Sequence, residues 1–130
     1  MPIEMKTAGV HHVTLRVSNL PRTKKFYVET LGFKPLMDTP ELLLVLAGGT
    51  AIGFRAPSAQ LPKGDAFNPH RIGVDHIALA CSDEQELERV ANALEQAGVE
   101  NTGAKMDSTL GKRYVAFKDP DRIAWEFYMA

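Results

Sequence analysis

The sequence predicts an α+β fold of two βαβββ modules, whose curved mixed sheets form an open, barrel-like cavity. Apolar and polar residues alternate over residues 10–18 and again over 74–81, as they do in half-buried strands. A helical pattern and then three strand-like segments follow each of these stretches. The two halves also share residues, because HVTLRVS from residue 12 matches HIALACS from residue 76 at an offset of 64. An internal repeat of this kind indicates two like modules with a shared cavity.

Module one is expected over about residues 8–57. After its first strand, Asn19 or Ser18 can cap a helix, and Pro21 suits the first helical turn. Gly32 is a natural end for that helix. The remaining strands are expected over residues 33–38, ELLLVLAGG and TAIGFRAP, with a turn at Gly48-Gly49.

A proline-rich and glycine-rich linker, residues 58–73, precedes module two at about residues 74–130. Its helix begins after Ser82 or Asp83, with Glu86 placed for a capping box, and it ends at Gly98. Further strands are expected at residues 103–108, 114–118 and 123–129. We therefore expect one domain, residues 1–130, made of these two modules.

The composition excludes several classes of function. The 15 basic and 16 acidic residues leave a net charge of −1, so no basic surface for nucleic acid is expected. No apolar segment approaches the length of a membrane span or a signal peptide. Cys81 is the only cysteine, which predicts a reducing compartment. We expect a soluble cytoplasmic protein that binds neither nucleic acid nor membrane.

Two histidines and one glutamate lie on the strand faces that point away from the helices. His12 and His76 occupy matching positions in the repeat, and Glu126 alternates with the apolar residues Trp125 and Phe127 on the last strand. These faces can converge on one cavity. Two imidazoles and one carboxylate leave coordination positions open and suit Fe, Mn, Ni, Co or Zn, so a divalent metal is expected in the cavity. His11 is expected on the apolar side, as a structural residue.

The chain resembles the vicinal oxygen chelate superfamily, which includes glyoxalase I, fosfomycin-resistance proteins, extradiol dioxygenases and bleomycin-binding proteins. The segments HHVTLRVSNLPRTKKFYVETLGF, DHIALACSD and FKDPDRIAWEFY carry the resemblance. It implies paired βαβββ modules, assembly as a homodimer, and metal ligands on the first and fourth strands of each module. Carried over by position, those ligand positions are His12, Gly53, His76 and Glu126.

Two departures narrow the chemistry that the resemblance implies. Glyoxalase I has a carboxylate at the position of Gly53, as ligand and base, and this chain has no side chain there. Ring-cleaving dioxygenases carry a histidine and a tyrosine before the DP turn. The corresponding segment here, LGKRYVAFKDP, has no histidine and has Ala116 at the tyrosine position.

Other polar residues are expected to face the cavity. Arg16 and Tyr128 are the candidate catalytic residues, Arg16 by holding a carboxylate or phosphate and Tyr128 by donating a proton or a hydrogen bond. The candidate substrate-binding residues are Thr14, Gly53, Arg55 and Tyr114.

These observations predict a metal-dependent glyoxalase/dioxygenase-family enzyme that chelates a small oxygen-bearing substrate. The reaction is a lyase, isomerase, transferase or dioxygenase reaction, and the sequence does not choose among them. The alternative is a non-catalytic binding and resistance protein of the bleomycin type. In a homodimer the site is built either within one chain or across two chains, with His12 of one chain meeting His76 and Glu126 of the other.

Overall fold

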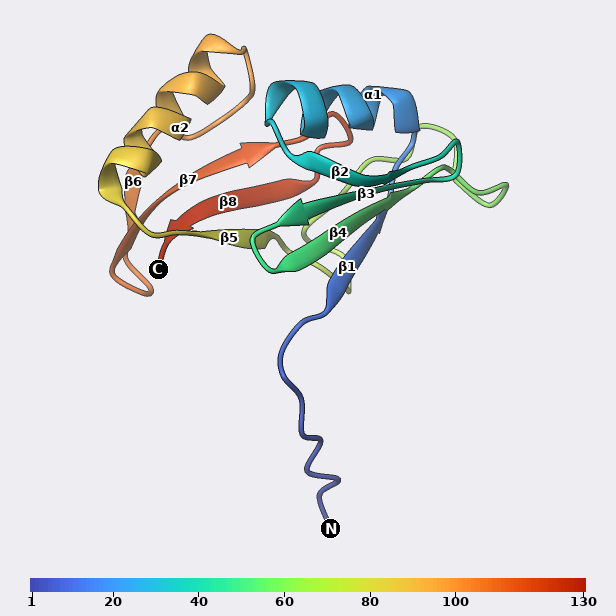
Figure 1. Cartoon of the computed structure of the whole chain (residues 1–130), viewed down its shortest axis with the longest axis horizontal. Coiled ribbons are helices and arrows are strands. Elements are labelled where there is room, and N and C mark those ends of the chain that lie inside the picture. Colours follow the sequence, from blue (N-terminus) through green and yellow to red (C-terminus); the bar gives the residue numbers. More distant parts are fainter.

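The computed structural model describes residues 1–130, as eight strands with one helical segment in each half (Figure 1). The elements of the first half are β1 (His12–Arg16), α1 (Leu20–Lys24), η1 (Lys25–Thr30), β2 (Lys34–Asp38), β3 (Leu42–Ala47) and β4 (Thr50–Arg55). Those of the second half are β5 (Ile77–Cys81), α2 (Glu84–Gln96), β6 (Lys105–Asp107), β7 (Lys112–Lys118) and β8 (Ala124–Met129). We call the first set module one and the second set module two.

Each module holds one four-stranded mixed sheet. The strand orders are β1-β4-β3-β2 and β5-β8-β7-β6. In both sheets the first strand pairs parallel with the last strand of its module, and the remaining pairs are antiparallel. The predicted two-module α+β architecture is confirmed, and the sheets are not closed into a barrel.

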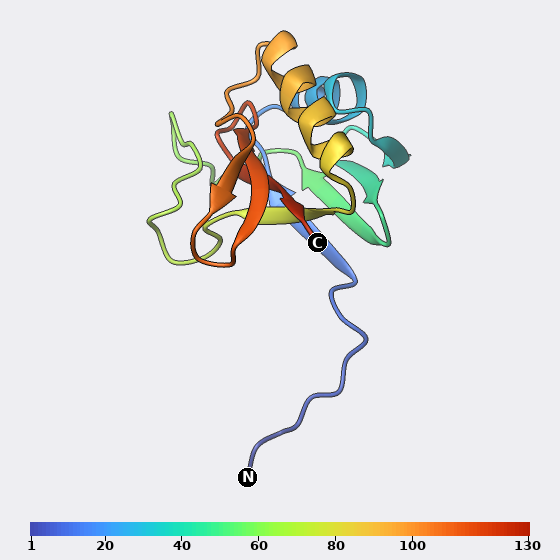
Figure 2. The same ribbon diagram turned by 90° about the vertical axis from the view of Figure 1, so that its left-hand side faces the viewer.

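The helices cover one side of both sheets and leave the other side open (Figures 1 and 2). The Asn19 side chain accepts a hydrogen bond from the Arg22 amide at the start of α1, and Asp83 accepts one from Glu86 at the start of α2. The first helix continues beyond α1 as η1, in π-helical form. We call the uncovered surfaces the open faces of sheet one and sheet two.

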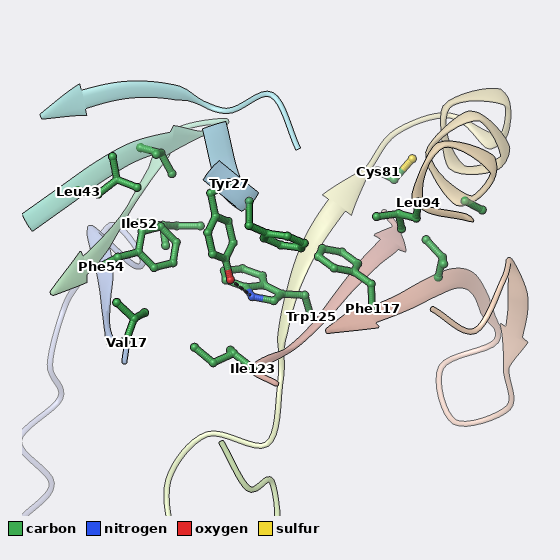
Figure 3. Close-up of a cluster of buried hydrophobic side chains, with 14 of the residues drawn as sticks. Val17, Tyr27, Leu43, Ile52, Phe54, Cys81, Leu94, Phe117, Ile123 and Trp125 are labelled. Atoms are coloured by element: carbon green, nitrogen blue, oxygen red, sulfur yellow. Dashed lines mark hydrogen bonds between the residues drawn. The ribbon is translucent and has the colours of Figure 1, made fainter. Parts of the chain in front are cut away.

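The two modules share a single core beneath the helices. Tyr27 from module one contacts Trp125 from module two, and the Trp125 indole donates a 2.7 Å hydrogen bond to the Tyr27 hydroxyl (Figure 3). That hydroxyl in turn donates to Asp119, at 2.7 Å. Asp119 is itself buried and also accepts bonds from the backbone amides of residues 121 and 123. We call Tyr27, Asp119 and Trp125 the seam, since they fix one module against the other.

A second contact joins the modules through the partly buried turn before β8. Asp121 lies in the turn before β8 and accepts bonds from the backbone amide and the hydroxyl of Ser18 at the end of β1. Arg22 completes the contact with a 3.1 Å ion pair to Asp121. The linker lies beside this turn, because the Phe67 amide donates to the Asp121 carbonyl.

Candidate functional site

The open face of sheet two brings together two of the three predicted metal ligands. His76 stands directly before β5 and Glu126 lies in β8, whose residues pair with β5 in parallel register. The His76 Nε2 lies 3.3 Å from the Glu126 Oε1. About 43% of the His76 side chain and 19% of the Glu126 side chain are exposed, so the pair is open to a ligand.

Asp75 fixes the orientation of His76. Its carboxylate lies 2.7 Å from Nδ1 of the imidazole, and this contact turns Nε2 toward Glu126. The hydrogen bond to Asp75 is the main reason that the pKa of His76 lies above its usual value, with the charge of Glu126 adding to it. A carboxylate behind a histidine is the usual support of a metal-binding imidazole. Asp75 was not among the predicted site residues, although its place directly before His76 was a usable signal.

Two tyrosines and an aspartate lie beside Glu126 on the same face. Tyr114 and Tyr128 face each other across β7 and β8, with ring centroids 5.7 Å apart. The Tyr128 hydroxyl donates a 2.7 Å hydrogen bond to Asp107 of β6, a residue that the sequence analysis also missed. Desolvation and this bond raise the pKa of Tyr128 to about 12, while the same hydroxyl lowers the pKa of Asp107. Tyr128 therefore keeps its proton at neutral pH.

The open face of sheet one carries the third predicted ligand. His12, Thr14 and Arg16 alternate on β1 and are exposed, as expected. The imidazole of His12 lies against that of His11, with 2.9 Å between the Nδ1 atoms. The expectation that His11 lies on the apolar side is wrong, because the strand begins only at His12 and His11 is exposed before it.

Gly53 is buried at the centre of this face. Thr14 is its partner on β1 and Leu44 its partner on β3. A Cβ atom at Gly53 would lie 3.1 Å from the Thr14 hydroxyl oxygen and 3.4 Å from Leu44 Cδ1. A side chain here would require Thr14 to move. With glycine, no side chain projects from the centre of this face.

Arg55 lies beside Arg16 in register, at the far end of the face from His12. The Arg16 guanidinium donates a 2.6 Å hydrogen bond to the carbonyl of Ala56. Neither arginine forms an ion pair. All the candidate substrate-binding positions of module one thus share one open face, while Tyr114 lies on the other sheet.

The structure does not bring His12 to His76 and Glu126 within one chain. No group of three histidine, cysteine or acidic side chains lies close enough to hold a metal ion. A cavity of about 290 Å³ lies at the end of β1 and is lined by Thr14 and Arg16, among others, but by neither His76 nor Glu126. Within one chain, the predicted ligands therefore lie in two separate places, with His12 on sheet one and the His76–Glu126 pair on sheet two.

Comparison with known proteins identifies the family to which this arrangement corresponds. The family model of the glyoxalase/bleomycin resistance protein/dioxygenase superfamily matches residues 9–127. The uncharacterised protein YwkD of Bacillus subtilis is 29% identical over 95% of this chain and 98% of its own length. The uncharacterised protein YaeR of Escherichia coli is 26% identical over 92% and 94%.

A solved structure has the same architecture. It is the glyoxylase/bleomycin resistance protein/dioxygenase domain from Frankia sp. EAN1pec, with 27% identity and a TM-score of 0.81 over 96% of this chain and 99% of that one. No helix of the present chain has the length and apolar character needed to cross a membrane.

Proposed function

Since the chain belongs to the glyoxalase/bleomycin resistance protein/dioxygenase superfamily, we propose that it is a metal-dependent enzyme that chelates a small oxygen-bearing substrate. The proposed metal ligands are His12, His76 and Glu126. The observation that carries the proposal is the pairing of His76 with Glu126 on an open face, with Asp75 behind the imidazole. Two imidazoles and one carboxylate fit a divalent ion such as Fe, Mn, Ni, Co or Zn.

The complete site requires two chains under this proposal. His12 lies on the other sheet, so a second copy must place its open face of sheet one against the His76–Glu126 pair. A twofold dimer would then contain two identical sites, each with His12 from one protomer and the pair from its partner.

The protein's own residues have distinct roles in this site. Asp75 holds His76 in the orientation that directs Nε2 to Glu126, and Arg16 and Tyr128 contact the substrate. Tyr128 retains its proton and acts as a hydrogen-bond donor. The bound ion would supply Lewis-acid stabilisation of negative charge on substrate oxygens.

Gly53 narrows the reaction class. Proton abstraction of the glyoxalase I kind uses a carboxylate at this position, and the backbone here is buried against Thr14 with no side chain to act as base. We therefore favour a reaction in which the substrate's own oxygens bind the ion and no protein carboxylate at residue 53 is needed.

The test is metal content measured by elemental analysis on the native chain and on four variants. His12→Ala, His76→Ala and Glu126→Ala should each lose the metal that the native chain binds. His70→Ala is the control, because His70 is an exposed histidine of the linker. Retention of metal by all three ligand variants would reject the proposed site.

Mixed dimers test the assembly. Differently tagged His12→Ala and Glu126→Ala chains are co-expressed, and the mixed species is isolated. A site shared between chains restores about half of the native metal content, since one of the two sites regains all three ligands. A site within one chain restores none.

A non-catalytic binding protein is the second candidate. Its support is the apolar row Leu42, Leu44 and Leu46 on the open face of sheet one, of which Leu46 is 42% exposed. This function requires no metal. A native chain that takes up no divalent ion, yet binds an aromatic drug such as bleomycin, would favour it over the enzyme.

A further inference from the structure

We propose that His11 is a positioning residue that favours the protonation form of His12 needed to bind a metal ion. In this form the His12 imidazole donates its proton from Nδ1 to His11 and keeps a free electron pair on Nε2. The inference rests on the proposed function, because it takes His12 as a metal ligand. The contact between the two imidazoles lies within one chain, so it does not depend on how two chains assemble.

Both modules place a hydrogen-bonding group behind the predicted ligand histidine. The Nδ1 atom of His76 lies 2.7 Å from a carboxylate oxygen of Asp75, and the Nδ1 atom of His12 lies 2.9 Å from Nδ1 of His11. His11 and Asp75 occupy matching positions in the repeat, each directly before the histidine that it contacts. The equivalence of the two modules thus extends from the histidine to the residue behind it.

The residue behind each histidine determines how strictly its proton is placed. A carboxylate only accepts hydrogen bonds, so Asp75 requires the proton of a neutral His76 to be on Nδ1. A neutral imidazole has one nitrogen that donates and one that accepts. At a separation of 2.9 Å the Nδ1 atoms of His11 and His12 share one proton, because two N–H groups or two electron pairs would repel each other. One of these two imidazoles therefore carries its proton on Nδ1.

Metal binding requires that the donor of this pair is His12. A histidine binds a metal ion through an unprotonated nitrogen and donates its other N–H to a group behind it. The Nδ1 atom of His12 is in contact with His11, so Nε2 is the nitrogen that remains for the ion. His11 then accepts through its own Nδ1. It has the role in module one that Asp75 has in module two, as a neutral acceptor in place of a charged one.

The surrounding chain keeps the two imidazoles together. The rings meet edge to face, with centroids 5.1 Å apart and an angle of 83° between their planes. His12 is the first residue of β1 and aligns with Ala51 of β4, so the sheet fixes its backbone. Neither imidazole contacts a carboxylate, and each is the only side-chain hydrogen-bond partner of the other.

The first experiment determines where the protons lie in the metal-free chain. Long-range proton–nitrogen NMR spectra distinguish protonated from unprotonated ring nitrogens, and they are recorded at about pH 9, where an ordinary histidine is neutral. The share of His12 that is protonated on Nδ1 should be lowest in His11→Ala, higher in the native chain, and highest in His11→Asp, which copies module two. His76 is the internal reference and should carry its proton on Nδ1 in all three chains.

The second experiment measures the affinity for Zn²⁺ by competition with a chelating indicator. His11→Ala should bind Zn²⁺ about 10–100-fold more weakly, the usual effect of losing the group behind a metal-binding histidine. His11→Asn should recover most of the affinity, because its side-chain carbonyl can accept the same proton. His70→Ala is the matched control, since it also removes an exposed histidine, and it should bind Zn²⁺ like the native chain.

Three results would overturn the inference. The first is an equal share of Nδ1-protonated His12 in the native chain and in His11→Ala, and the second is an unchanged Zn²⁺ affinity in His11→Ala. The third is a complete loss of Zn²⁺ binding in both His11→Ala and His11→Asn, which would make His11 itself a ligand. The proposed function fails separately. A native chain that takes up no metal rejects the metal site, and the NMR spectra still decide whether His11 places the His12 proton.

Discussion

Modules one and two place the larger side chain of an equivalent residue pair on opposite strands. On the open face of module one, Thr14 lies opposite Gly53. At the matching place in module two, Ala78 lies opposite Glu126. Each pair combines one small residue with one larger residue. The larger residue lies on the first strand in module one and on the last strand in module two. The space beside Glu126 is available because its partner is alanine, and the space beside Thr14 is available because its partner is glycine.

The charges of the two faces differ in the same complementary way. Two residues beyond these pairs, module one has Arg16 and Arg55, whereas module two has Ala80 and Tyr128. At these positions module one carries two cations and module two carries the carboxylate of Glu126, while Lys105 and Lys112 also lie on the open face of sheet two. Because the paired arginines and the Glu126 carboxylate lie on different faces, neither face is expected to work alone.

The largest stability effect is expected where the modules are joined. Tyr27→Phe leaves the Asp119 carboxylate and the Trp125 indole N–H each short of one buried partner. The loss should be about 2–4 kcal/mol of unfolding free energy, because two buried polar groups lose a hydrogen bond. Urea unfolding followed by tryptophan fluorescence measures it. A loss under about 0.5 kcal/mol, the range typical of surface substitutions, would show that the seam does not hold the modules together.

The same variant should show a characteristic pH dependence. Burial raises the pKa of Asp119, and the Tyr27 hydroxyl opposes that rise, so Tyr27→Phe raises this pKa further. A folded-state pKa above the unfolded one contributes stability at low pH that is lost as the pH rises through the folded-state value. The stability gap between variant and native chain should therefore widen from about pH 4 to pH 7. A gap that narrows over this range would contradict the assignment.

The next largest effect is expected when Thr14 and Gly53 of module one are replaced by alanine and glutamate, the residues of the matching pair in module two. Gly53→Glu alone should cost about 1–3 kcal/mol, since its Cβ crowds the Thr14 side chain in a packed sheet. Adding Thr14→Ala should recover much of that cost. A double-mutant cycle in urea measures the coupling, with Thr14→Ala alone as the control. Simple additivity of the two changes would mean that the exchange of large and small residues has no energetic basis.

The smallest effects should be equal in the two modules. Asn19 and Asp83 occupy matching positions in the repeat, and each caps its helix through one hydrogen bond to the backbone. Asn19→Ala and Asp83→Ala should each lower the free energy of unfolding by about 1 kcal/mol. The denaturant midpoints of the two variants, each compared with that of the native chain, show whether the two losses are equal. A clear difference between them would show that one helix depends on its neighbours more than on its cap.

The sequence was sufficient for features that depend on local alternation and repetition. The alternating faces of the strands and the two helical segments follow from spacing along the chain. Spacing left two candidates for each helix cap and wrongly placed His11 on the apolar side. Asp107 was missed because it reaches Tyr128 through the register between β6, β7 and β8, which is set by the turns between those strands. The separation of His12 from the pair was also beyond sequence patterns. It depends on how the modules pack through the seam, where Tyr27 and Asp119 are 92 residues apart.

The parallel pairing of β1 with β4 has a consequence for the order of folding. His12 aligns with Ala51, about 40 residues later, whereas β2, β3 and β4 are joined by short turns. Closing the longer loop costs more chain entropy, so the antiparallel strands are expected to assemble first and β1 to dock last. During synthesis β1 leaves the ribosome before β4, its partner strand, has been made. The backbone hydrogen-bonding groups of β1 therefore stay unpaired until β4 emerges. The strand that presents His12, Thr14 and Arg16 is thus the last part of its module to become ordered.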